Sequence, residues 1–193
     1  NQMICDLNEG YAIYRPRYIL PDYNVYIKKG CEFLELPPPK DLDEALDGLL
    51  ILYSHVPSIT TFPVYIGRLD VLLDPFITDE EQDYIKIKRF LNHVDKTVPD
   101  SFCHANIGPY DTKAGRLILK AVIELEAPTP NMTIRYDKSK TSREFAELAA
   151  KACLLVSKPS FANDAYYISD LGEQYGIASC YNALPECGDR KST

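Results

Sequence analysis

The segment 175–182, Tyr-Gly-Ile-Ala-Ser-Cys-Tyr-Asn, places a cysteine where it can react. Cys180 stands at the end of a short apolar run, and a loop over residues 183–188 follows it. A cysteine at the tip of a strand can act as a nucleophile, a metal ligand or a radical carrier, whereas one on a helix face usually only packs. Position alone favours ordinary burial for Cys180, because cysteine is among the residues most often found in protein cores.

A second candidate is the pair Cys103-His104, inside a block of small and polar residues at 98–109. A thiol and an imidazole can form a thiolate–imidazolium pair, which would make the protein a cysteine-dependent hydrolase or transferase. Neighbouring residues on a strand point to opposite faces, so Cys103 and His104 would not pair with each other. A pair between His104 and Cys180 remains sterically possible.

Metal and nucleotide sites have little support in the sequence. Cys180 and Cys187 are separated by six residues, whereas zinc ligand pairs are usually separated by about two to four. No G-x-G-x-x-G or Walker-type phosphate loop occurs. We therefore predict no metal and no bound cofactor.

Composition narrows the class of protein further. The 193 residues are 46% apolar and 25% charged, as in ordinary globular domains. The net charge of −7, without a basic cluster, argues against a nucleic-acid partner. No apolar run approaches the roughly 20 residues that cross a bilayer, so we predict no membrane partner. The six cysteines are spread along the chain, which predicts reduced thiols and a cytoplasmic location.

The order of predicted elements indicates an α/β fold. Residues 1–40 are an irregular lead-in, rich in proline and tyrosine, and residues 41–193 alternate helices and strands. A capping box of Asp41 and Glu44 begins the first helix, and Thr78 caps a later one. Residues 98–109 are predicted to be extended and loop-like. Helices are expected over residues 41–55, 69–76, 78–95, 113–126 and 141–157, and extended segments over residues 58–67, 131–136 and 175–180. This alternation predicts parallel strands in a single, partial domain over residues 1–193.

Several blocks of the sequence resemble YjjI-type predicted glycyl radical enzymes. The longest is Gly-Cys-Glu-Phe-Leu-Glu-Leu-Pro-Pro-Pro-Lys-Asp-Leu-Asp-Glu-Ala at residues 30–45. The other blocks are residues 55–58, 63–67, 100–109, 130–133 and 175–182. The resemblance covers nearly the whole chain. It implies an α/β fold that is part of a ten-stranded barrel surrounded by many helices.

The resemblance also implies a radical chemistry. Glycyl radical enzymes hold an unpaired electron on a glycine in a C-terminal loop, where an activase with S-adenosylmethionine and an iron–sulfur cluster installs it. The glycine takes hydrogen from a cysteine, whose thiyl radical then takes hydrogen from a small-molecule substrate under anaerobic conditions. By resemblance, Cys180 is the thiyl candidate and Cys103 the runner-up, with His104, Asn106 and Asn182 in the substrate pocket. The implied partner is a radical-activating enzyme, and a homodimer is allowed.

One departure from the family pattern concerns the glycine itself. No motif of the type Arg-Val-x-Gly-aromatic occurs in the sequence. We therefore expect the chain to be a fragment, inactive alone, of a larger enzyme that carries the glycine elsewhere. A cysteine-dependent hydrolase or transferase and a non-catalytic interaction domain remain the alternatives.

Overall fold

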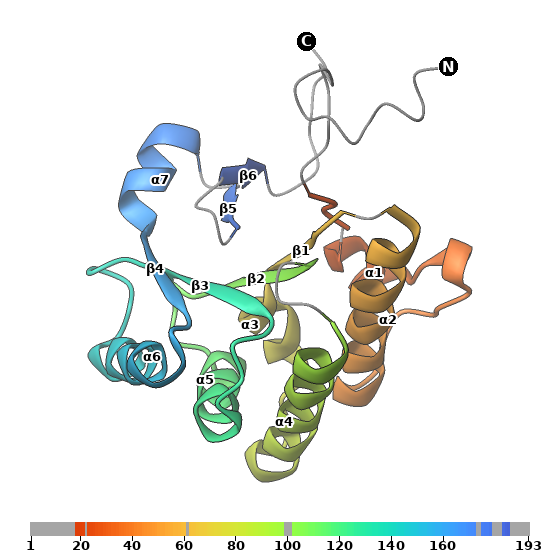
Figure 1. Ribbon diagram of the computed structural model, residues 1–193, viewed down its shortest axis with the longest axis horizontal. Helices are drawn as coiled ribbons and strands as arrows, with labels where there is room; N and C mark the ends of the chain where they lie inside the picture. Colours follow the sequence, from red (N-terminus) through yellow and green to blue (C-terminus); the bar gives the residue numbers. More distant parts are fainter. Residues whose placement is uncertain are drawn as a thin grey trace.

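A parallel sheet of four strands forms the centre of the protein in the computed structural model, which describes residues 18–21, 23–60, 62–98, 102–172, 175–178 and 183–185. The strand order follows the chain (Figure 1): β1 (Val64–Arg68), β2 (Cys103–Ile107), β3 (Asn131–Tyr136) and β4 (Ser160–Asn163). Ile19 forms a further parallel bridge to Val64 of β1. The predicted α/β class and parallel strands are thus confirmed, in the form of a four-stranded parallel sheet.

Helices cover one face of this sheet, and a small antiparallel pair lies over the other (Figure 1). On the helical side are α2 (Leu42–Thr60), α3 (Leu69–Leu73), η3 (Asp74–Phe76), α4 (Glu80–Thr97), α5 (Lys113–Leu125) and α6 (Arg143–Val156). Before them come α1 (Tyr23–Lys29) and η2 (Glu32–Leu34). On the opposite side lie α7 (Asp164–Leu171), β5 (Tyr175–Ile177) and β6 (Ala183–Pro185). None of the described helices is both long and apolar enough to cross a membrane.

The two faces of the sheet differ in chemistry because side chains alternate along each strand. On β2, Cys103, Ala105 and Ile107 belong to the apolar core shared with the helices. The intervening His104 and Asn106 are also buried, but on the other face. The same alternation on β3 directs Met132 and Ile134 into the core, and Thr133 and Arg135 to the other face. We call this second side, with Tyr65 of β1, the polar face.

The predicted helices are present with shifted ends. The first was expected to stop near His55, but α2 continues through Pro57 to Thr60. A proline removes one helical hydrogen bond, which does not end a helix when it falls in the last turn. The cap of α4 is Asp79 rather than Thr78, because the Asp79 carboxylate accepts hydrogen bonds from the amides of Glu81 and Gln82. The capping box at Asp41 is confirmed by a 3.0 Å bond from the Glu44 amide.

Several elements were not predicted. The lead-in contains α1, and residues 98–109, expected to be extended and loop-like, are extended at Cys103–Ile107 but form the inner strand β2 there. Polar residues there argued against a core strand, yet they occupy the polar face, where other polar groups meet them. The strand β4 and the helix α7 were also missed, since four residues of strand leave little periodicity to detect.

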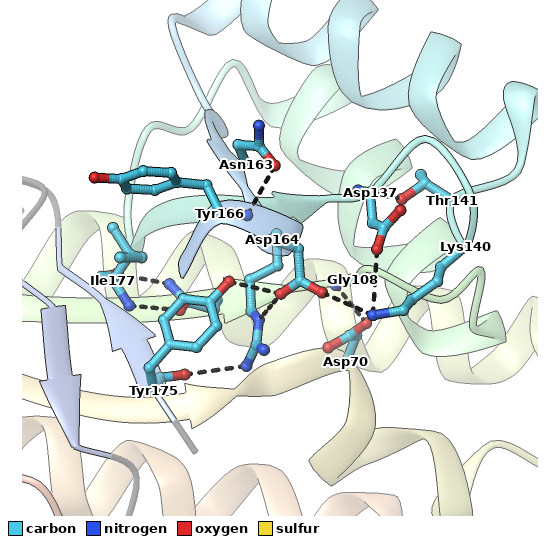
Figure 2. A network of polar contacts seen from close by, with 12 residues as sticks. Asp70, Gly108, Asp137, Lys140, Thr141, Asn163, Asp164, Tyr166, Tyr175 and Ile177 are labelled. Carbon is cyan, nitrogen blue, oxygen red and sulfur yellow. Dashed lines mark hydrogen bonds and ion pairs between the residues drawn. The ribbon is translucent and has the colours of Figure 1, made fainter. Parts of the chain in front are cut away.

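Asp70 connects the carboxyl ends of β1 and β2. Its Oδ2 accepts hydrogen bonds from the Gly108 amide at 2.8 Å and from the Thr112 hydroxyl at 3.3 Å. Figure 2 shows Asp70 beside Gly108. The residue is fully buried, and burial raises the pKa of its carboxyl to about 6, although the hydrogen bond from Gly108 acts in the opposite direction. At neutral pH folding therefore confines a charge in a site that disfavours it.

Replacing Asp70 with asparagine should make stability less dependent on pH. The folded pKa of about 6 lies above the ordinary value of 3.8, so the favourable contribution of Asp70 is complete below about pH 4 and is lost as pH rises through about 6. A difference of about 2 in pKa corresponds to about 3 kcal/mol. Urea titrations should show the free energy of unfolding shifting in favour of Asp70→Asn by about 2 kcal/mol between about pH 4.5 and about pH 7.5, because part of the full effect is already lost at about pH 4.5. A pH-independent difference between the two proteins would contradict this.

Candidate functional site

The short strand β5 lies on the polar face of the sheet and leads directly toward Cys180 in the sequence. It pairs with β6 in antiparallel register, with Tyr175 opposite Pro185 and Ile177 opposite Ala183. The connection between the two strands contains the predicted site residues Cys180 and Asn182, which lie outside the described residues. The described part of the site is therefore the attachment of β5 to the sheet.

Asn106 of β2 holds the backbone of Ile177. Its Nδ2 donates a hydrogen bond to the Ile177 carbonyl at 2.7 Å, and its Oδ1 accepts one from the Ile177 amide at 2.8 Å. The same Oδ1 accepts a third bond, from the Tyr65 hydroxyl at 2.9 Å. A side-chain amide presents one donor and one acceptor, as a neighbouring strand would. Asn106 thus substitutes for a strand partner at Ile177.

Tyr65 of β1 lies directly beneath Gly176. A Cβ atom at residue 176 would be 2.0 Å from the Tyr65 hydroxyl oxygen and 2.3 Å from its ring carbon Cζ. These distances are far shorter than any van der Waals contact, so only glycine allows β5 to approach this closely. The close approach is what brings Ile177 within reach of Asn106.

Arg135 of β3 holds Tyr175, the first residue of β5. Its Nη1 donates to the Tyr175 carbonyl at 3.0 Å, and its guanidinium lies 4.0 Å from the centre of the Tyr175 ring. The Arg135 Nε also pairs with the Asp164 carboxylate of α7 at 2.8 Å, and the Tyr175 hydroxyl donates to the same oxygen at 2.6 Å. Lys140 reaches the second Asp164 oxygen at 3.4 Å (Figure 2).

The charges in this network perturb one another. Burial raises the pKa of Asp164, but the hydrogen bonds from Tyr175, Arg135 and Lys140 and the positive charge of Arg135 together outweigh it and hold that pKa below its ordinary value. Burial, together with the neighbouring Asp164 carboxylate, raises the pKa of Tyr175. Asp164 is therefore charged and Tyr175 neutral near pH 7, which is the state that the hydrogen bond between them requires.

Three consecutive residues of β5 thus lie against three different strands: Tyr175 is hydrogen-bonded by β3, Gly176 packs on Tyr65 of β1, and Ile177 is hydrogen-bonded by β2. A small apolar cluster of Tyr175, Ile177 and Ala162, with Tyr167 and Ile168 of α7 against it, completes the attachment. The rings of Tyr167 and Tyr175 stack at 5.3 Å. We call this arrangement the β5 docking site.

The predicted site residues separate into distinct environments. Cys103 is fully buried in the core between the sheet and the helices, on the side away from β5. His104 and Asn106 lie on the polar face, where the His104 ring meets the edge of Tyr18 at 5.2 Å. The expectation that Cys103 and His104 point to opposite faces is confirmed, and no thiolate–imidazolium pair forms between these two residues. A substrate contact by His104 or Asn106 stays a prediction.

Sequence reasoning missed Tyr65, Arg135 and Asp164. A signal for Arg135 was present, because it occupies an alternate position of the predicted strand at residues 131–136, and a buried arginine needs a partner. The partner could not be found from the sequence, since Asp164 lies 29 positions away in the unpredicted helix α7. Among the described residues, no three His, Cys, Asp or Glu side chains lie close enough to hold a metal ion.

Removing Arg135 should destabilise the β5 docking site more than removing the Tyr175 hydroxyl. The side chains of Arg135 and Asp164 are only 4% and 1% exposed, so Arg135→Met leaves a buried carboxylate without its main partner, at a cost of about 3–5 kcal/mol. Tyr175→Phe keeps the ring and loses one hydrogen bond to a charged acceptor, about 1.5–3 kcal/mol. Urea unfolding of both variants measures these values. Equal losses would show that the Arg135–Asp164 pair is not the dominant contact.

Comparison with known proteins gives the family. The model of the family described as glycyl radical enzyme YjjI-like matches residues 1–192. An uncharacterized protein of Haemophilus influenzae strain Rd is 95% identical over 188 residues, which are 97% of this chain and 37% of that protein. The uncharacterized protein YjjI of Escherichia coli K12 is 48% identical over 189 residues, 96% of this chain and again 37% of the relative. The chain spans 37% of the length of these curated relatives. It belongs to the glycyl radical enzyme YjjI-like family.

Proposed function

We propose that this chain supplies the thiyl cysteine of a glycyl radical enzyme. Cys180 would exchange a hydrogen atom with a glycine carried by another part of the full-length protein. The resulting thiyl radical would take hydrogen from a small-molecule substrate in an anaerobic cytoplasm. An S-adenosylmethionine and iron–sulfur activase would install the radical on the glycine.

The observation that carries this proposal is the fixed position of β5. Consecutive Cα atoms are about 3.8 Å apart, so the Cα of Cys180 lies within about 11 Å of that of Ile177 in any conformation. Ile177 itself is tied to the centre of the sheet by two hydrogen bonds from Asn106. Transfer of an atom requires reacting centres about 3–3.5 Å apart. The chain that leads to the cysteine is held by side-chain hydrogen bonds at Tyr175 and Ile177, which supports such a role.

The chemistry at Cys180 is a homolytic exchange. The Sγ–H bond breaks and a C–H bond forms at the glycine Cα, while the unpaired electron passes from carbon to sulfur. The reverse step restores the glycyl radical, and no external oxidant or reductant is consumed. Cys103 is less suited to this role, because it packs in the helix-facing core on the other side of β2. His104 and Asn182 remain our candidates for substrate contacts.

The architecture is compatible with a segment of the ten-stranded barrel that we propose for the whole enzyme. Parallel sheets are found with both faces covered. Here helices cover one face, and β5 covers part of the other with polar contacts (Figure 1). In a barrel, the helical layer lies outside and the polar face lies inside, so β5 would approach from the interior.

A comparison of two cysteine variants tests the proposal. Full-length protein carrying Cys180→Ala or Cys103→Ala is activated without oxygen and examined by electron spin resonance. Both variants should give a glycyl doublet, split by the remaining Cα hydrogen. In D2O the Cys180 thiol carries solvent deuterium, so exchange through sulfur should collapse the doublet in the wild type and in Cys103→Ala. It should not do so in Cys180→Ala.

Two results would refute the proposed function. One is the absence of any glycyl doublet after activation of the wild-type protein. The other is collapse of the doublet in Cys180→Ala at the wild-type rate. A block of exchange in Cys103→Ala, with normal exchange in Cys180→Ala, would transfer the thiyl role to Cys103.

A further inference from the structure

We propose that Asn106 is a positioning residue, which sets the place from which Cys180 exchanges hydrogen. This inference rests on the proposed function and adds to it a residue that acts through the backbone of Ile177. Asn106 stands on β2, an inner strand paired on both sides, and its side chain is fully buried. It is therefore a rigid point from which the chain toward Cys180 can be held.

The Asn106 amide is engaged in a way that fixes its orientation. Its Oδ1 accepts from the Ile177 amide and the Tyr65 hydroxyl, and its Nδ2 donates to the Ile177 carbonyl. Rotating the amide by half a turn would bring a donor against the Ile177 amide and an acceptor against the Ile177 carbonyl. Both peptide groups of Ile177 are thus defined, and with them the direction in which the chain leaves β5.

The other attachments of β5 act further from Cys180. Arg135 holds the carbonyl and the ring of Tyr175, five residues before Cys180, whereas Asn106 holds Ile177, three residues before it. A displacement of Ile177 is separated from Cys180 by fewer backbone bonds than a displacement of Tyr175, so fewer torsion angles can compensate for it. Since a displacement of about 1 Å can slow a reaction about 100-fold, we expect the attachment at Ile177, the nearest to the cysteine among the described residues, to affect the rate more than the attachment at Tyr175.

The role differs from the substrate contact that the family resemblance suggested for Asn106. Both acceptor positions of Oδ1 and one donor of Nδ2 are already occupied by the protein. An amide has two acceptor positions and two donors. The described contacts are thus those of a residue that holds the protein chain, and a substrate group that needs Oδ1 would have to displace them.

Two substitutions at Asn106 separate its polar contacts from its volume. Asn106→Leu keeps a similar size and removes both hydrogen-bonding groups. Asn106→Asp keeps the acceptor for the Ile177 amide but sets a carboxylate oxygen against the Ile177 carbonyl. A third variant, Gly176→Ala, moves β5 sterically and leaves Asn106 intact, because the new Cβ would collide with Tyr65.

The matched control is Asp79→Ala, which removes the cap of α4 on the helical side of the sheet. This change destabilises by about 1 kcal/mol without touching the polar face. All variants are made in the full-length protein, activated without oxygen, and transferred to D2O. The measurements are the yield of glycyl radical, the rate at which its doublet collapses, and hydrogen exchange of the backbone amides in a peptide containing residues 175–178.

If Asn106 positions Cys180, the variants at Asn106 and Gly176 retain the glycyl radical but lose the doublet about 10- to 100-fold more slowly than the wild type. Their amides in β5 exchange faster, and Asp79→Ala resembles the wild type in both measurements. The Gly176→Ala variant gives an independent result should a substitution at Asn106 prevent folding.

Wild-type rates of doublet collapse in the Asn106 and Gly176 variants, with faster amide exchange in β5, would overturn this inference and leave the role of Cys180 intact. An equal slowing in Asp79→Ala would also overturn it, because general loss of stability would then explain the effect. Failure of the proposed function has a different signature: either the wild type gives no doublet, or Cys180→Ala exchanges as fast as the wild type.

Discussion

Buried polar groups need partners, and this requirement shapes the polar face of the sheet. A buried amide or guanidinium group without a hydrogen-bond partner has lost its hydration without compensation, and this loss destabilises a protein by several kcal/mol. Asn106 and Arg135 are both buried there, and both direct hydrogen bonds to the backbone of β5. If β5 left the sheet, these groups would lose the hydrogen-bond partners that β5 provides. The sheet and the strand over it therefore depend on each other.

The buried pair of Arg135 and Asp164 restricts where β5 can lie on the sheet. Such pairs contribute little net stability over apolar residues of similar size, but breaking one is strongly unfavourable. The Arg135 guanidinium contacts the Asp164 carboxylate of α7, and it also contacts the carbonyl and the ring of Tyr175 in β5. Few alternative placements of β5 would satisfy all of these groups together. We therefore infer that this pair selects one position of β5 on the sheet, and that it adds little to the net stability of the attachment of β5.

The sequence predicted the parts of the fold that have long, regular patterns. The strand Asn131–Tyr136 and the helix Lys113–Leu125 were located closely, because alternation and a repeat of three to four residues are visible in one segment. The strand at Cys103–Ile107 was missed for a physical reason. Its polar residues suggested a loop, and they are compatible with a buried strand only because β5, about 70 residues later, supplies their partners. Asn106 was chosen as a site residue from the family resemblance, but its contact with Ile177 could not be read from the sequence.

The strand β5 is attached to the main sheet differently from a strand that lies inside a sheet. A strand inside a sheet is held by a ladder of backbone bonds, which no single side chain controls. Within the described part of the chain, the strand β5 has such bonds only to the short strand β6, and it reaches the main sheet through side chains of Tyr65, Asn106 and Arg135. Its position is therefore encoded by individual residues and can be altered one contact at a time. The apolar core lies on the opposite face of the same sheet, so a contact of β5 can be changed without removing a side chain from that core.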